Sequence, residues 1–196
     1  MPIFKHAYDL TNKVEGGYAN DPDDKGGETY RGIARLKHPN WRGGFRIDEV
    51  KLLTSDAKAI STMLDSDKNL QKIVKEFYLQ EFWSRINGDL FPDQRIVNEV
   101  YDNAVNMGIE KSSELLQRTI NVLNRNQKDY LDVKVDKEIG RRTIMALEDC
   151  IKHNGVQRIL NVLNGYQIKH YLECMERNPV NEKYRGWFDR VEVVWS

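Results

Sequence analysis

Residues 14–33 read Val14-Glu15-Gly16-Gly17-Tyr18-Ala19-Asn20-Asp21-Pro22-Asp23-Asp24-Lys25-Gly26-Gly27-Glu28-Thr29-Tyr30-Arg31-Gly32-Ile33. The stretch places carboxylates, two Gly-Gly pairs and one threonine between two apolar anchors, a composition unlike that of a core helix or strand. Glycine adopts turn conformations at little steric cost, and Asn, Asp and Pro favour turns. The sequence therefore predicts a tightly folded acidic loop, and loops of this kind carry chemistry more often than packing.

The bulk composition is that of one globular domain. The chain has 196 residues, 40% of them hydrophobic, and its 30 basic and 30 acidic residues cancel. A folded chain of this size buries roughly 70% of its unfolded surface. A net charge of zero lacks the electrostatic signature of a nucleic-acid binder, so we expect no nucleic acid partner. No apolar run is long enough to span a bilayer, so we expect no stable membrane insertion.

Hydrophobic residues recur at helical spacing along most of the chain, which predicts a mainly α fold. The first helix is expected to end at Glu15, before Gly16-Gly17, and Asp56 is typical of a helix N-cap. Gly108 and Gly155 are expected to separate helices, and Asn178-Pro179 to end one. The expected helical segments are 3–15, 57–64, 70–83, 96–105, 115–123, 143–151, 156–174 and a last amphipathic element over 184–191.

Strand signals are few. Only residues 18–33 and Phe45–Ile47 have the pattern of paired strands, and they predict a small hairpin. The segment from Lys37 to Arg46 is expected as a turn-rich connection. No low-complexity linker or internal repeat divides the chain into independent domains.

Glu15 lies at the expected C-terminal end of the first helix. Backbone carbonyls make the potential there negative, which raises the pKa of a carboxyl group. A carboxyl group that stays protonated near neutral pH can act as a general acid. The alternative, from position alone, is a solvated glutamate at a helix end.

Asp24 and Thr29 follow inside the loop, whose glycines allow the chain to turn back toward Glu15. A carboxylate and a hydroxyl group opposite a protonated acid can position water and stabilise positive charge on a sugar, which is the arrangement used in glycoside hydrolysis. The alternative is an Asx-type turn in which these side chains cap backbone N–H groups. For Asp21 and Asp23 we prefer that alternative.

Metal and nucleotide sites are not expected. Asp21, Asp23 and Gly26 fit the start of an EF-hand loop, but Lys25 occupies a ligand position and Gly32 stands where a bidentate Glu is needed. The histidines lack the spacing of zinc ligands, and no phosphate-binding glycine motif occurs. We therefore expect neither a metal nor an organic cofactor.

The two cysteines, Cys150 and Cys174, fall within helical patterns. A small apolar side chain there is ordinary core filling. A disulfide between them requires their helices to pack face to face, which the sequence leaves open.

Several short motifs together resemble a known family. Within the opening stretch they are Glu15-Gly16-Gly17-Tyr18, Asn20-Asp21-Pro22, Asp24-Lys25-Gly26-Gly27-Glu28-Thr29 and Gly32-Ile33. Further along they are Phe82-Trp83, Asp102-Asn103-Ala104-Val105-Asn106-Met107-Gly108, Leu116-Gln117, Val135-Asp136, Ile139-Gly140, Thr143 and Gly186-Trp187-Phe188-Asp189-Arg190. The chain in this way resembles glycoside hydrolase family 108, whose members are N-acetylmuramidases, phage-type endolysins or secretion activator proteins.

The resemblance implies a lysozyme-like, mainly helical fold with a small β-hairpin next to the catalytic Glu. It also implies cleavage of the β-1,4 bond between N-acetylmuramic acid and N-acetylglucosamine in peptidoglycan. Glu15 matches the proton donor of the family, and Asp24 and Thr29 best fill the second and third roles of phage-type lysozymes.

Three further residues, Tyr30, Asp102 and Asn106, are candidate glycan contacts. Asp102 and Asn106, four residues apart, could instead satisfy one another. The resemblance divides the chain into a catalytic region over 1–92 and a helical peptidoglycan-binding region over 93–196, expected to pack as one globular unit.

Two other functions remain open at this point. A lytic transglycosylase cuts the same bond but lets a hydroxyl of the sugar attack, and a non-catalytic peptidoglycan-binding or secretion accessory protein would keep the fold without turnover. The expected partner is a bacterial peptidoglycan glycan strand. Residues 1–6 do not lead into a signal-peptide core, so we expect synthesis in the cytoplasm and action at the cell wall or periplasm after non-classical release, for which a holin or a secretion system is the expected export partner.

Overall fold

The computed structural model describes residues 1–12, 17–20 and 27–191 of the chain. It divides into two compact units. The sheet unit is Tyr8–Glu81, and the helical unit is Met1–Ala7 together with Phe82–Ser196. Two elements cross the division in the sequence, namely helix α1 (Phe4–Thr11) and the π-helical turn η1 (Leu79–Trp83).

The sheet unit contains a three-stranded antiparallel sheet of very short strands. These are β1 (Tyr18–Ala19), β2 (Thr29–Tyr30) and β3 (Ile33–Ala34), in the order β1-β2-β3. The two residues between β2 and β3, Arg31 and Gly32, both have positive φ, at 49° and 75°. A two-residue turn of type I′ requires positive φ at both positions, so this turn fixes the pairing of β2 with β3.

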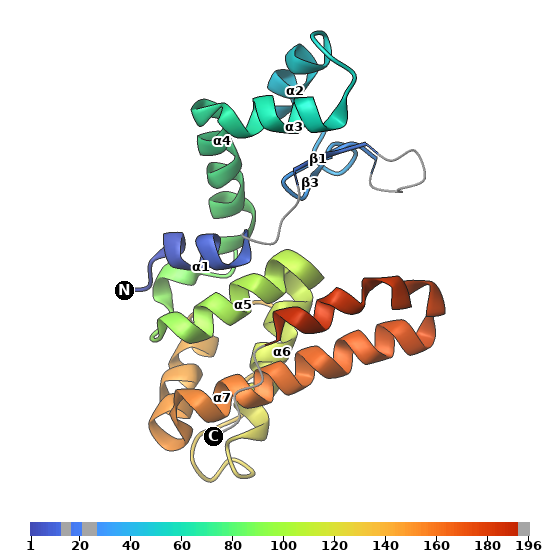
Figure 1. Ribbon diagram of the computed structural model, residues 1–196. Helices are drawn as coiled ribbons and strands as arrows, with labels where there is room; N and C mark the ends of the chain where they lie inside the picture. Colours follow the sequence, from blue (N-terminus) through green and yellow to red (C-terminus); the bar gives the residue numbers. More distant parts are fainter. Residues whose placement is uncertain (13–16, 21–26, 192–196) are drawn as a thin grey trace. The chain divides into compact units, whose positions relative to one another are not determined.

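The helices of the sheet unit are α2 (Gly43–Lys51), α3 (Ala57–Ser66) and α4 (Lys68–Tyr78). Asp56 caps α3 by accepting a hydrogen bond from the Ala59 amide, as the sequence predicts. Asp67 caps α4 with extended backbone (φ −80°, ψ 100°), so α4 leaves α3 at a sharp angle (Figure 1). The buried hydrophobic residues of this unit include Tyr30, Ile33, Ile47, Val50, Ile60, Leu64, Leu70, Val74 and Tyr78.

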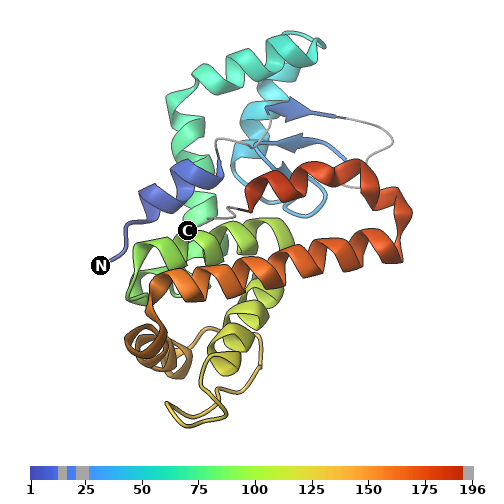
Figure 2. The ribbon, with the colours of Figure 1, turned by 60° about the horizontal axis from the view of Figure 1, so that its bottom comes forward.

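The helical unit is built from α5 (Gln94–Met107), α6 (Ile109–Val122) and α7 (Arg141–Arg177). Two 3₁₀ helices accompany them, η2 (Gly88–Leu90) of three residues and η3 (Pro179–Arg190) of twelve. Helix α6 packs against both α5 and α7, and η3 packs against α7. Figure 2 shows η3 (red) folding back along α7 (orange).

Two glycines break the helices of this unit where the sequence predicts it. Gly108 has φ 88° and joins α5 to α6, and Gly155 has φ 71° and kinks α7. Both values lie in the left-handed region that favours glycine. Helix α7 then ends at Arg177, directly before Asn178-Pro179.

The first residues of the chain complete the core of the helical unit. The Phe4 ring lies 5.6 Å from the ring of Trp83 and 5.9 Å from that of Tyr101. The amide of Ile3 donates a hydrogen bond to the side chain of Gln94 at 2.5 Å. Burial of the three aromatic rings against each other supplies stabilisation that α5 alone does not have.

The mainly α prediction is confirmed, and two local predictions are wrong. Phe45–Ile47 is not a strand but part of α2, where Ile47 and Val50 are buried and Phe45 is 74% exposed. The expected connection from Lys37 to Arg46 is too long, because α2 already begins at Gly43. The helical prediction for 70–83 is confirmed by α4 and by η1, whose winding is that of a π-helix. The expected helix end at Glu15 lies outside the described residues.

Three further expectations from the sequence concern the division of the chain into regions, the two cysteines and membrane-spanning segments. The helical unit includes Met1–Ala7 and residues 82–92, which the sequence grouped with the first region, and a domain boundary at residue 92 stays a prediction. Cys150 and Cys174 are both free thiols. Among the helices of the described chain, none combines the length and apolar character needed to cross a bilayer.

A pair of glycine substitutions tests the packing of the helical unit. A Cβ atom at Gly88 would overlap the indole of Trp83, which is fully buried, whereas a Cβ at Gly165 in α7 meets nothing within 4 Å. We expect Gly88→Ala to lower the free energy of unfolding by about 1–3 kcal/mol through overpacking. Gly165→Ala is expected to raise it by about 0.5–1 kcal/mol, because alanine favours the helix. Urea unfolding midpoints measure both, and equal effects would contradict the Trp83 packing.

Candidate functional site

The structure describes four of the six site residues expected from the sequence. Glu15 and Asp24 lie outside the described residues. Thr29 is a half-buried residue of β2, where it pairs with Ala19 of β1 and Ala34 of β3. Its position in the middle of the sheet gives its side chain a fixed backbone frame.

Glu28, the residue before Thr29, holds the sheet to helix α2. Its carboxylate accepts hydrogen bonds from the hydroxyl of Tyr18 at 2.9 Å, from Nε of Arg35 at 2.9 Å and from Nζ of Lys51 at 2.6 Å. The Arg35 guanidinium also donates to Asp48 and to the carbonyl of Gly44, both in α2. The side chain of Glu28 is only 11% exposed, so these partners take the place of water.

This network determines the charge of Glu28. Burial alone would raise the pKa of the carboxyl group, but the hydrogen bonds from Lys51, Arg35 and Tyr18 outweigh it, and the pKa lies below its usual value. Burial and the hydrogen bond to Glu28 in turn raise the pKa of Tyr18 to about 12. Glu28 is therefore a carboxylate at neutral pH and cannot serve as a general acid there.

Tyr30 is fully buried in the sheet unit. Its hydroxyl donates to Asp65 at 2.9 Å and accepts from the side-chain amide of Gln71 at 2.8 Å. Burial raises the pKa of Tyr30 to about 12. The geometry favours a packing role that ties β2 to α3 and α4, and a glycan contact through Tyr30 stays a prediction.

The hairpin turn at Arg31 is held from two sides. The guanidinium of Arg31 pairs with Asp65 at 2.7 Å, and its carbonyl accepts from the hydroxyl of Tyr78 at 2.6 Å. Tyr78 also meets Tyr8 of α1 edge to face, with ring centroids 5.8 Å apart. These contacts connect the hairpin to the last turns of α1 and α4.

An open hollow of about 610 Å³ lies between these elements. It is lined by Tyr8, Asp9 and Asn12 of the α1 end, by Arg31, and by Gln71, Lys72 and Lys75 of α4. Nζ of Lys75 lies 5.7 Å from the centre of the Tyr8 ring. Asn12 Oδ1 is buried and has no hydrogen-bond partner in the described part of the chain. The hollow thus combines cationic side chains, a phenol and an amide oxygen without a described partner. One of its lining residues, Asn12, stands three residues before Glu15 in the sequence.

The other end of that stretch is anchored on α3. The amide of Tyr18 donates to Oγ of Ser61 at 3.2 Å, and a Cβ atom at Gly17 would overlap the Ser61 side chain. The carbonyl of Gly17 accepts from the amide of Arg31 at 3.3 Å. Gly17 is therefore required for the close approach of this backbone to α3 and to the hairpin.

Asp102 and Asn106 lie in the helical unit on α5. The Asn106 amide donates to the Asp102 carboxylate at 2.9 Å, which is the mutual contact that the sequence allows. Arg190 of η3 also pairs with Asp102 at 3.4 Å. A role of either residue in glycan binding stays a prediction.

The sequence analysis did not predict the structural contacts that Glu28 and Ser61 make. Glu28 stands beside Thr29 in a motif that the sequence analysis quotes, but its partners Arg35 and Lys51 are 7 and 23 residues away. Ser61 has no local signal, because its function is to accept one backbone amide 43 residues earlier in the chain. Only the folded arrangement brings these groups together.

Comparisons with known proteins agree with this architecture. A mainly helical chain with a small three-stranded antiparallel sheet is the architecture expected of a lysozyme-like glycoside hydrolase. The family model described as Glycosyl hydrolase 108 matches residues 8–108, more than half of the chain, and the chain belongs to this family. The model described as Predicted Peptidoglycan domain matches residues 111–192.

A solved structure shows the same fold. The structure of SagA from Brucella abortus matches with a TM-score of 0.63 and 22% sequence identity, covering 96% of this chain and 88% of the SagA chain. No curated protein matches the chain.

Replacement of Glu28 tests the network around the sheet. We expect Glu28→Gln to lower the free energy of unfolding at neutral pH by about 1–3 kcal/mol, because charged hydrogen bonds to Arg35 and Lys51 are lost. The pKa of Glu28 is depressed in the folded state, so its contribution is present above the unfolded pKa and is lost as pH falls through the folded pKa. The difference between wild type and variant should therefore shrink from neutral pH toward about pH 3.

Urea unfolding across this pH range measures the effect. Glu49→Gln is the matched control, since the Glu49 side chain is 65% exposed and its pair with Arg46 is expected to contribute under about 1 kcal/mol. A difference between wild type and Glu28→Gln that does not change with pH would contradict the assigned charge.

Proposed function

We propose that the chain is an N-acetylmuramidase that cleaves the β-1,4 bond between N-acetylmuramic acid and N-acetylglucosamine, with Glu15 as general acid. The observation that carries the proposal is the Glycosyl hydrolase 108 match over residues 8–108, which includes the acidic glycine-rich stretch. The Predicted Peptidoglycan domain over 111–192 supports peptidoglycan as the substrate. Such a bond breaks when a carboxylic acid protonates the leaving oxygen.

Two described acids of the sheet unit, Glu28 and Asp65, do not suit the role of general acid. Glu28 is held as a carboxylate by Arg35 and Lys51, and Asp65 is paired with Arg31 and accepts from Tyr30. Both carboxylates are thereby committed to structural contacts. A general acid must carry a proton at the working pH, a requirement that Glu28 does not meet.

Asp24 and Thr29 complete the proposed catalytic group. A carboxylate at Asp24 would stabilise the oxocarbenium-like charge or activate water, and the Thr29 hydroxyl would orient that water. The fixed frame of Thr29 in β2, next to the locked Glu28, suits a positioning role of this kind. No metal ion is part of this scheme.

Glu15→Gln tests the acid directly. We expect the variant to lose at least about 100-fold in turnover, because a carboxamide cannot donate the proton. New reducing ends released from purified peptidoglycan measure turnover, and circular dichroism checks the fold. Glu49→Gln, an exposed acid of α2, should keep wild-type activity.

The products of the same digestion separate the mechanisms. Hydrolysis gives reducing ends, and a lytic transglycosylase gives anhydro sugars that mass spectrometry detects. Equal release of reducing ends by wild type and Glu15→Gln would refute the role of Glu15 as general acid. Anhydro sugars as the sole products would refute hydrolysis and indicate a lytic transglycosylase.

A second pair of variants tests Thr29. Thr29→Val keeps the branched shape that suits a strand but removes the hydroxyl, and Thr29→Ser keeps the hydroxyl. We expect Thr29→Val to lose about 100-fold in turnover and Thr29→Ser to stay within about tenfold of wild type. Initial rates of reducing-end release measure both. Wild-type turnover in Thr29→Val would refute a role for the hydroxyl group.

A further inference from the structure

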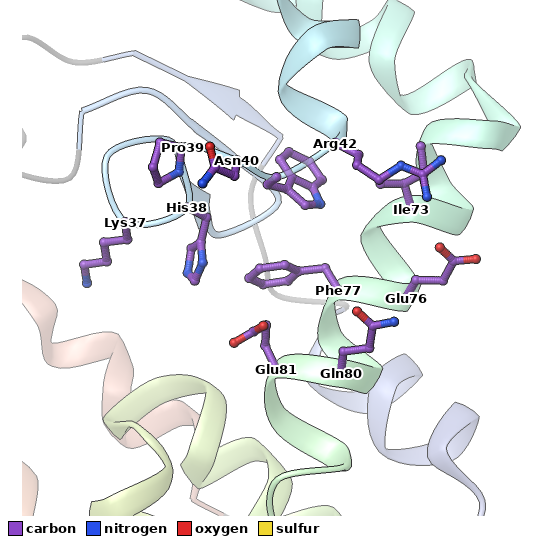
Figure 3. Close-up of a pocket in the computed structure, with 11 residues that line it drawn as sticks. Lys37, His38, Pro39, Asn40, Arg42, Ile73, Glu76, Phe77, Gln80 and Glu81 are labelled. Carbon is purple, nitrogen blue, oxygen red and sulfur yellow. The ribbon is translucent and has the colours of Figure 1, made fainter.

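A second hollow of the sheet unit lies apart from the residues discussed above. It has a volume of about 450 Å³, and it opens between the connection from β3 to α2 and the last turns of α4 and η1. Figure 3 shows Phe77 projecting from α4 toward His38 on the connection, with Gln80 and Glu81 below it. Its size falls in the range of small-ligand sites, about 300–1,000 Å³.

Aromatic side chains form the apolar part of this hollow. The rings of His38 and Phe77 meet edge to face with centroids 4.7 Å apart, and those of Trp41 and Phe77 meet at 6.1 Å. All three residues are half-buried, so part of each ring is exposed. The hollow therefore offers apolar surface within reach of a ligand.

The polar lining is balanced in charge and rich in amides. Lys37 and Arg42 contribute two cations, and Glu76 and Glu81 contribute two carboxylates. The side chains of Asn40 and Gln80 are exposed and make no hydrogen bond to any described residue. Such a lining suits a neutral ligand with many hydroxyl or amide groups better than it suits an ion.

The indole of Trp41 is held by packing alone. Its Nε1 is buried and has no hydrogen-bond partner within the described residues, and its ring lies directly on the backbone of Gly43. A buried N–H group without a hydrogen-bond partner destabilises the fold. Trp41 therefore lines the hollow through its ring and not through its N–H group.

We propose that this hollow binds an N-acetylhexosamine unit of the glycan strand. A sugar ring presents C–H faces to aromatic rings such as those of Trp41 and Phe77, and its hydroxyl and acetamido groups match the exposed amides of Asn40 and Gln80. The identity of the sugar rests on the proposed function, since a peptidoglycan strand consists of N-acetylated hexosamines. The hollow then adds a binding subsite to the sheet unit.

Indole N–H signals in two-dimensional NMR test the subsite. The probe is tri-N-acetylchitotriose, titrated into the full chain carrying Glu15→Gln to limit cleavage. The chain has four tryptophans, and the Trp41 signal is assigned by its loss in Trp41→Phe. We expect the Trp41 Nε1–H signal to shift on binding. The double variant Asn40→Ala, Gln80→Ala should bind about tenfold more weakly, since it removes two hydrogen-bonding side chains.

Asn69→Ala is the matched control. Asn69 is an exposed amide at the start of α4, outside the hollow, and its loss should leave the affinity unchanged. An unmoved Trp41 signal at saturating sugar, or full affinity in the double variant, would overturn the proposal. So would a shift caused by a stem peptide of peptidoglycan but not by the sugar.

The experiments distinguish a failure of the proposed sugar subsite from a failure of Glu15 as the proposed acid. Release of reducing ends by wild type without a Trp41 shift overturns only the subsite. A sugar-dependent Trp41 shift together with undiminished cleavage by Glu15→Gln supports the subsite and overturns only the acid.

Discussion

The carboxylate of Glu28 is the interaction on which the sheet unit depends. A sheet made of strands only two residues long has too few hydrogen bonds and too little apolar surface to persist alone. Glu28 compensates by bonding Tyr18 of β1, Arg35 after β3 and Lys51 of α2 at once. Because the carboxylate is 11% exposed, an unpaired partner would be costly, so the three contacts are expected to form together.

The contacts of Glu28 distinguish it from Glu15, the proposed general acid of the same stretch. Glu28 is surrounded by cations and donors, which hold it charged and fixed. The proposed acid, Glu15, must have the opposite property and keep its proton. Gly17, whose backbone lies against Ser61, anchors the chain between the two glutamates. The proposed role of Glu15 therefore requires surroundings unlike those of Glu28.

The sequence predicted the elements whose signals are local. Asp56, Gly108 and Gly155 act within one turn of their own positions, so their capping and breaking effects were readable from the chain alone. Helix α2 was missed because it starts with Gly43-Gly44 and its buried positions, Ile47 and Val50, are too few to outweigh the alternation around Phe45.

Fewer contacts of the candidate site residues could be predicted from spacing in the sequence. The Asp102–Asn106 contact follows from helical spacing and was foreseen as one of two alternatives. The partners of Glu28 and of Tyr30 come from α2, α3 and α4, at sequence separations that no spacing rule covers. The sequence thus predicted a candidate stretch for the site but not the contacts of Glu28 and Tyr30 that hold the sheet next to it.

The family match and the compact units divide the chain at different places, and the difference bears on how the helical region is stabilised. The Glycosyl hydrolase 108 match extends to residue 108 and so includes α5, whereas α5 packs with α6 and α7 in the helical unit. The hydroxyl of Ser112 in α6 donates to the carbonyl of Val100 in α5 at 2.6 Å, and both residues are fully buried. Removal of the segment matched as Predicted Peptidoglycan domain would expose this face of α5. The segment matched as Glycosyl hydrolase 108 therefore depends on the segment that follows it for the burial of α5.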